Sequence, residues 1–177
     1  MNATLYTIAY PDCAHADLRT IDAWRAAHDS AGHALVRPHF TLVFACNAVD
    51  EGTYLAHVAA VAARSAAIPF HCRYAMLGAD AHSPRAHAYL VPDEGHAALS
   101  LLHDALYTGP LHDQLRLDLP YTPHITVGTF DLAAHARQWC SDRNREGVSV
   151  PGRVTALWVG QVVDGSFVHR GQFPLLG

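Results

Sequence analysis

The sequence predicts an α+β fold of two related, pseudo-symmetric lobes, each with an antiparallel sheet flanked by helices, which face one another across a central cleft. Strand-like and helix-like stretches alternate along all 177 residues. A Pro-His-apolar-Thr-apolar pattern occurs once in each half, at Pro38–Leu42 and at Pro123–Val127. No low-complexity linker separates the halves. We therefore expect residues 1–177 to form one domain of two lobes.

The chain begins with a strand and a helix. Residues 5–10 alternate in the manner of a strand, and Pro11 ends it. Asp12 is expected to cap a helix that runs to about Ser30, with Gly32 marking its end. The apolar face of this helix is formed by residues that recur at helical spacing: Leu18, Ile21, Trp24 and Arg25.

The first copy of the repeated pattern opens the next strand, which we expect to run to about Ala45. A turn over residues 47–52 follows, and an alanine-rich helix is then predicted to extend to about Ala66. Two further strands are predicted over residues 68–77 and 86–91, separated by a turn-like segment from Gly78 to Pro84.

The second half repeats this alternation. Residues 92–95 are a favourable helix start, and the buried side of the helix is lined by leucines, namely Leu99, Leu102 and Leu106. After the second copy of the pattern, Asp131 is expected to cap another helix. Residues 148–163 read as a strand interrupted at Pro151–Gly152, and Asp164–Gly165 predicts a hairpin turn into a final strand.

The composition is typical of a globular protein with a sizeable core, since 50% of the residues are apolar and 16% are charged. No apolar run is long enough to cross a bilayer, and the N-terminal residues lack the features of a signal peptide. The four cysteines are scattered without a Cys-x-x-Cys pair, which favours reduced thiols. We expect a cytoplasmic monomer with no membrane partner.

The charge of the chain limits its partners. The formal net charge is −4 with histidine neutral, and the sequence contains no basic run. Binding of a long nucleic acid duplex by neutralisation of its phosphates is therefore not expected. A small nucleotide or an RNA end, held by a few specific groups, is compatible with this charge.

The repeated pattern places four polar side chains on one face. Successive side chains of a strand point to opposite faces, so His39 and Thr41 share a face while the apolar residues between and after them point into a core. The same holds for His124 and Thr126. If the two strands lie side by side, two imidazoles and two hydroxyls converge on one cleft.

The full pattern is more specific than the His-x-Thr that it contains. Histidine makes up 14 of the 177 residues, so about one His-x-Thr is expected by chance. Requiring the proline and both apolar positions lowers the chance expectation to about 0.01 per chain. The alternative is a pair of ordinary half-buried strands whose histidines face inward.

Two imidazoles on one cleft suit acid–base chemistry in which one takes a proton while the other gives one. A threonine hydroxyl on the same face can donate a hydrogen bond to a phosphate oxygen, which adds orientation and charge stabilisation without a metal. The set predicts cleavage of a phosphodiester. One histidine would activate water or a ribose hydroxyl, and the other would protonate the leaving oxygen.

The paired motifs resemble those of the 2H phosphoesterase superfamily, in particular its 2′,5′ RNA ligase-like branch. The stretch from His87 to Asp93, Tyr121–Val127 and the C-terminal hairpin ending in Gln172-Phe-Pro-Leu are also similar to successive parts of that family. The resemblance implies a bilobal fold. It also implies a metal-independent and cofactor-free phosphodiesterase, active on a 2′,3′-cyclic phosphate or 2′,5′ phosphodiester of a nucleotide or RNA end.

The same resemblance implies roles for individual residues. His39 and His124 become the catalytic acid–base pair, and Thr41 and Thr126 become the hydroxyls that bind the substrate phosphate. Which histidine is the base is left open. The chain departs from the family at Gly128–Thr129, where a larger apolar or basic residue is common, so the neighbouring substrate contact is in question.

Two further residues near the motifs are candidate substrate contacts. Tyr121 could stack on a base or bond a phosphate, and the alternative is an aromatic side chain that packs against its lobe. Arg37, two residues before His39, could reach an anion if the strand extends that far. The alternative for Arg37 is a solvated surface residue.

Three other interpretations of the sequence compete with hydrolysis. The cleft could bind a nucleotide or RNA end without turning it over, or the protein could act in reverse as a 2′,5′ RNA ligase. A metal could bind His96 and His103, seven apart on a predicted helix, although Asp104 points elsewhere on that helix. We predict hydrolysis, because water is the abundant nucleophile, with no metal and no cofactor.

Overall fold

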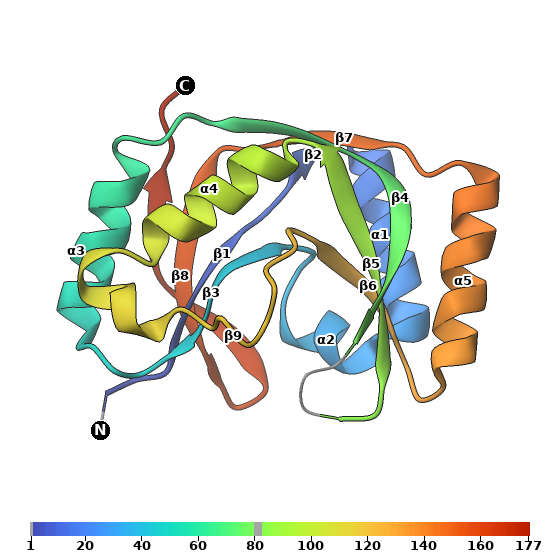
Figure 1. Cartoon of the computed structure of the whole chain (residues 1–177), viewed down its shortest axis with the longest axis horizontal. Helices are drawn as coiled ribbons and strands as arrows, with labels where there is room; N and C mark the ends of the chain where they lie inside the picture. The colour runs from blue at the N-terminus through green and yellow to red at the C-terminus, as the bar shows by residue number, and fades with distance from the viewer. Residues whose placement is uncertain (1, 80–82) are drawn as a thin grey trace.

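The computed structural model describes residues 2–79 and 83–177, in which nine strands form one sheet and helices flank it (Figure 1). The strand order is β2-β7-β4-β5-β6-β3-β1-β8-β9, and every neighbouring pair is antiparallel. The strands are β1 (Leu5–Ala9), β2 (Asp12–Cys13), β3 (Phe40–Cys46), β4 (Ile68–Ala79), β5 (Ala86–Glu94), β6 (Ile125–Phe130), β7 (Val150–Val154), β8 (Ala156–Val163) and β9 (Ser166–Pro174). The helices are α1 (His15–His28), α2 (Ser30–Leu35), α3 (Glu51–Ala62), α4 (His96–Leu106), the 3₁₀ helix η1 (Gly109–Gln114) and α5 (Ala133–Glu146).

The two sheets expected from the sequence are joined into one. Strands β3 and β6, which carry the two copies of the repeated pattern, lie next to one another and pair through Phe40 and Ile125. This short seam connects a five-stranded half of the sheet to a four-stranded half. The expected α+β class with antiparallel strands and flanking helices is confirmed, and the two sheets expected for the two lobes are the two halves of one continuous sheet.

The helices cover the two halves of the sheet differently. Helix α3 packs on β8 and β9, whereas α1 and α5 pack on strands of the β4–β6 group (Figure 1). Helix α4 contacts β3, β4 and β5, so it lies over both sides of the seam. None of the helices within the described part of the chain is both long and apolar enough to span a bilayer.

The alternation expected in the two motif strands is present. Phe40 and Leu42 are fully buried on β3, and Ile125 and Val127 are fully buried on β6. Burial of each such side chain stabilises the fold by about 1.5–3 kcal/mol. The intervening polar residues consequently lie on the opposite, partly exposed face of both strands.

Two expected helix boundaries in the first half are wrong. Asp12 does not cap α1; it pairs with Arg153 in the short β2–β7 ladder, and the helix begins at His15. Gly32 does not end α1 but lies within α2. A Cβ at Gly32 would overlap the carboxylate of Asp29, so a side chain at this position would displace that carboxylate.

Two expectations in the second half are also wrong. Asp131 does not cap α5; its carboxylate accepts a hydrogen bond from Arg85 at 3.1 Å, and the helix begins at Ala133. The strand predicted over residues 148–163 breaks at Thr155, not at Pro151–Gly152. Pro151 pairs with His71 of β4 on one side, whereas β2 pairs only with the two residues that follow Pro151. The other side of β7 is therefore unpaired at this proline, where a missing N–H is tolerated.

Candidate active site

The four motif side chains are grouped about the seam between β3 and β6. Phe40 pairs with Ile125, and the strands run antiparallel. Extending this register by one residue in each direction places His39 opposite Thr126, and Thr41 opposite His124. Cross-strand neighbours of this kind have Cβ atoms about 5 Å apart. A local two-fold arrangement therefore brings both His-Thr pairs together, as the sequence pattern predicts.

A cavity of about 310 Å³ opens on this face of the sheet, and three motif side chains line it: His39, Thr41 and Thr126. Its apolar walls include Tyr6, Ile8, Leu35, Val36, Phe44, Val162 and Phe167. Its polar walls include Arg25, Asp29, His87 and Thr129. A larger surface cavity of about 490 Å³ lies between α1 and the start of α5, and it is lined by none of the four motif residues. We therefore take the smaller cavity as the candidate site.

His124 is held beside this cavity by an aromatic neighbour. Its ring stacks on Tyr89 of β5, with ring centroids 3.8 Å apart and planes inclined by 25°. Tyr89 in turn stacks against His87, with centroids 5.6 Å apart. His87 and Tyr89 are two residues apart on one strand and therefore share the face on which the motif residues lie.

Both motif histidines are held in the same tautomer. Nδ1 of His39 lies 2.8 Å from the carbonyl oxygen of Arg37, and Nδ1 of His124 lies 2.7 Å from the carbonyl oxygen of Thr122. A carbonyl oxygen only accepts hydrogen bonds, so Nδ1 must carry the proton and donate it in each case. In the neutral ring Nε2 is consequently left with a free lone pair, ready to accept a proton.

Burial lowers the pKa of both motif histidines from the ordinary value near 6.5 to about 4. The hydrogen bond to the Arg37 carbonyl opposes this shift at His39, while the charges of Arg25 and His124 add to it. At His124 the hydrogen bond to Thr122 opposes the shift, and His87 adds to it. Both imidazoles are therefore neutral at pH 7 in the free protein.

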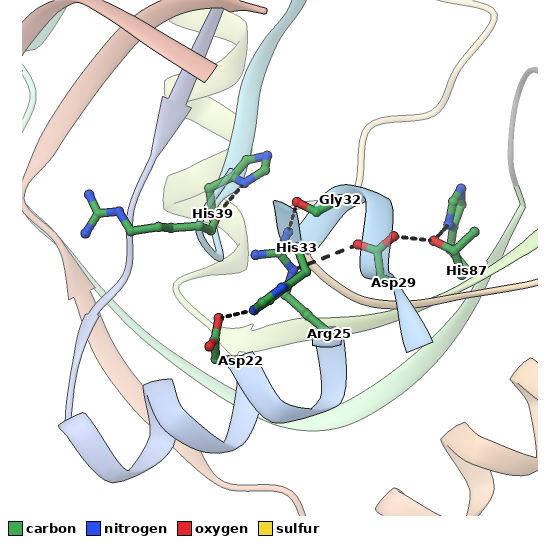
Figure 2. A network of polar contacts seen from close by, with 9 residues as sticks. Asp22, Arg25, Asp29, Gly32, His33, His39 and His87 are labelled. Atoms are coloured by element: carbon green, nitrogen blue, oxygen red, sulfur yellow. Dashed lines mark hydrogen bonds and ion pairs between the residues drawn. The ribbon is translucent and has the colours of Figure 1, made fainter. Parts of the chain in front are cut away.

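A polar network connects helix α1 to strand β5 along one wall of the cavity (Figure 2). The buried guanidinium of Arg25 donates to the carbonyl oxygen of Gly32 at 2.7 Å and lies 3.9 Å from the carboxylate of Asp29. Asp29 accepts a hydrogen bond from the Thr129 hydroxyl at 3.0 Å, and this hydroxyl lies 3.1 Å from Nδ1 of His87. These contacts hold the polar side chains of the cavity wall in place next to the two His-Thr pairs.

Five residues around this cavity were not predicted from the sequence as site residues: Arg25, Asp29, Thr129, His87 and Tyr89. Two patterns in the sequence nevertheless pointed to some of these residues. Arg25 recurs at helical spacing with apolar residues, so its burial follows from its place on the inner face of α1. His87 and Tyr89 alternate with apolar residues in a strand-like stretch, as the motif residues do.

A glycine in β4 makes room for the aromatic neighbour of His124. A Cβ at Gly78 would overlap the ring of Tyr89. We expect Gly78→Val to push this ring against His124, to lower the free energy of unfolding by about 1–3 kcal/mol and to reduce kcat by up to about 10²-fold. Urea unfolding and steady-state kinetics would measure both effects. A variant that is destabilised but keeps full kcat at a temperature where it is folded would contradict the positioning role.

Tyr121, a candidate substrate contact, is engaged within the protein. Its hydroxyl donates to the carbonyl oxygen of Thr41 at 3.0 Å, and its ring stacks on His103 with centroids 3.6 Å apart. Burial raises the pKa of Tyr121, so the hydroxyl remains a donor. These contacts favour the packing alternative and give Tyr121 a role in holding the first motif strand.

Arg37, the second candidate contact, is exposed next to the site. Its carbonyl oxygen orients His39, and its guanidinium lies over the ring of Tyr10, 4.0 Å from the ring centroid. The side chain thus lies outside the cavity that contains the motif hydroxyls. It remains available to a ligand that extends beyond this cavity.

The candidate metal ligands on α4 are not brought together with further ligands. Nδ1 of His103 lies 2.8 Å from the carbonyl oxygen of Leu42, and the ring packs against Tyr121. Among the residues that the structure describes, no three histidine, cysteine or acidic side chains are placed to share a metal ion.

The chain matches a known protein family over most of its length. The model of the family described as the 2′-5′ RNA ligase superfamily matches residues 11–165. No curated protein matches the chain significantly.

Solved structures with the same fold cover almost the whole chain. A crystal structure of E. coli LigT complexed with 3′-AMP is 18% identical, with 100% of both chains covered and a TM-score of 0.59. TT0787 of Thermus thermophilus is 16% identical, with 98% of each chain covered and a TM-score of 0.60. Usb1 of Kluyveromyces marxianus is 12% identical, with 98% of this chain and 99% of that chain covered and a TM-score of 0.58.

Proposed function

Because the chain belongs to the 2′-5′ RNA ligase superfamily and hence to proteins that process phosphodiesters, we propose that it is a metal-independent phosphodiesterase. Its substrate would be a 2′,3′-cyclic phosphate or 2′,5′ phosphodiester of a nucleotide or RNA end. The proposal depends mainly on two histidines that both carry their proton on Nδ1. They lie at the two strands that meet at the seam, and each has a threonine two residues further along the chain. Such a pair supplies one base and one acid.

In the proposed reaction on a cyclic phosphate, Nε2 of one histidine takes a proton from water as the water oxygen bonds to phosphorus. The bond from phosphorus to one ribose oxygen breaks, and the other histidine gives its Nε2 proton to that oxygen. Thr41 and Thr126 would donate hydrogen bonds to the non-bridging oxygens, where negative charge develops. The product is a nucleoside 2′- or 3′-monophosphate, and solvent exchange restores the protons of the pair.

Two further observations support a small nucleotide substrate in the cytoplasm. Crystal structures of E. coli LigT, which shares the fold, contain 3′-AMP, NADP⁺ or ATP. All four cysteines of this chain are free thiols, as expected in a reducing compartment.

The proposal is tested by turnover of a panel of 2′,3′-cyclic nucleotides and 2′,5′-linked dinucleotides in excess chelator. We expect hydrolysis of at least one substrate class, and the released monophosphate identifies the bond that is cleaved. Saturable nucleotide binding without turnover of any substrate would instead indicate a binding module.

The pH dependence of kcat/KM should be shifted towards acid. The active free protein needs one protonated and one neutral histidine, and both pKa values lie at about 4. We expect kcat/KM to be highest in mild acid and to fall by about tenfold per pH unit above roughly pH 5. The optimum of kcat should lie higher, because a bound phosphodiester anion raises both pKa values. A bell-shaped kcat/KM profile centred near pH 6.5 would contradict this assignment.

A further inference from the structure

A strip of aromatic side chains leads from the cavity across β1, β8 and β9. Phe167 lines the cavity, and its ring centroid lies 5.6 Å from that of His169. His169 lies 4.7 Å from the Trp158 ring and 5.8 Å from the Tyr10 ring. We call Tyr10, Trp158, Phe167 and His169 the aromatic strip.

Tyr10, at the other end of the strip, lies beside a motif histidine. Ile8 pairs with Thr41 across β1 and β3, so continuing this antiparallel register by two residues places Tyr10 opposite His39. On the other side of β1, Ile8 pairs with Trp158. Because alternate residues of a strand share a face, the strip and the motif side chains lie on the same face of the sheet.

The strip remains open to solvent. His169 is exposed, and Tyr10, Trp158 and Phe167 are half-buried. A Cβ at Gly160 would meet the ring of Phe167, so the absence of a side chain there lets this ring lie across β8 towards the cavity. A row of aromatic rings on an exposed sheet face provides stacking surfaces for unpaired bases.

A positive charge accompanies the strip. The guanidinium of Arg37 lies 4.0 Å from the Tyr10 ring centroid, and no carboxylate of the described residues forms an ion pair with it. Partial burial, together with the nearby charge of Arg37, lowers the pKa of His169. Arg37 thus offers a positive charge for one backbone phosphate at the Tyr10 end of the strip.

We propose that the aromatic strip and Arg37 bind the nucleotide that precedes the reacting one. The substrate is accordingly the 3′ end of a short single-stranded RNA that carries a terminal 2′,3′-cyclic phosphate. This inference rests on the proposed phosphodiesterase function. A free mononucleotide would occupy the cavity alone and leave the strip unused. A duplex would keep its bases paired and away from the rings, and the net charge of −4 does not favour one.

The test compares kcat/KM for a dinucleotide that ends in a 2′,3′-cyclic phosphate with kcat/KM for the matching cyclic mononucleotide. We expect the wild type to prefer the dinucleotide by about tenfold or more, in line with the contribution of one stacked base. Trp158→Ala and His169→Ala should bring this ratio close to one, whereas Trp158→Phe should retain it. His112→Ala, an exposed change on η1, serves as the matched control. A wild-type ratio of one, or equal losses on both substrates, would overturn the inference.

A binding measurement keeps this test independent of turnover. The same proteins are titrated with a dinucleotide 3′-phosphate and with a mononucleotide 3′-phosphate. Tighter binding of the dinucleotide that Trp158→Ala and His169→Ala abolish would support the subsite, even if no substrate is hydrolysed and the proposed activity fails. Equal affinities of the wild type for both ligands would overturn it.

Discussion

Replacement of either motif histidine by alanine is expected to lower kcat by about 10²–10⁴-fold. Each variant removes one of the two proton transfers, and a positioned acid or base contributes a factor of this size. His39→Ala leaves His124 with its tautomer intact, since Thr122 rather than His39 fixes it, and the converse holds for His124→Ala. Steady-state turnover of the best cyclic nucleotide measures the effect.

The control for both histidine variants is His112→Ala, because His112 is exposed on η1 and lies outside the cavity lining. This control should keep wild-type kcat. Near-UV circular dichroism would show that all three variants retain their tertiary packing. Full activity of either motif variant would refute the catalytic role of the histidine replaced.

Loss of a motif hydroxyl should have the second-largest effect. Thr41→Val and Thr126→Val keep the shape of the side chain but remove the donor to the charged phosphate oxygens. Removal of one such donor typically costs about 10²–10³-fold in kcat. We expect this loss in each variant, with a smaller change in KM, because the charge on these oxygens grows in the transition state.

Serine at the same positions separates hydrogen bonding from packing. Thr41→Ser and Thr126→Ser keep the hydroxyl and should recover most of the activity. Thr20→Val, on the exposed side of α1, is a matched control for the substitution itself. If the serine variants are as impaired as the valine variants, the hydroxyls do not act on the phosphate.

Local features of the fold could be predicted because they depend on neighbours in sequence. The alternation of polar and apolar residues identified both motif strands and the face of each polar side chain. The hairpin at Asp164–Gly165 was also predictable, since both residues adopt a positive φ that aspartate and glycine tolerate. The joining of the two halves at Phe40 and Ile125 was not, because it depends on pairing between distant segments.

The site was predictable to a similar extent. The motifs indicated the four residues that the register brings together, whereas the surrounding wall is assembled by contacts between elements that are distant in the sequence. Arg25 and Asp29 reach the cavity from the end of α1, and Thr129 joins them only because β6 lies beside α1. Such contacts follow from tertiary packing, which one sequence does not encode in any local spacing.

A double-mutant cycle in excess chelator tests the central claim most directly. The cycle compares kcat of the wild type, of His39→Ala, of His124→Ala and of the variant with both changes. If the two histidines act as one acid–base pair without a metal, wild-type activity survives the chelator and the double variant is about as impaired as the worse single variant. Loss of wild-type activity in chelator, or losses that multiply in the double variant, would contradict the two-histidine account.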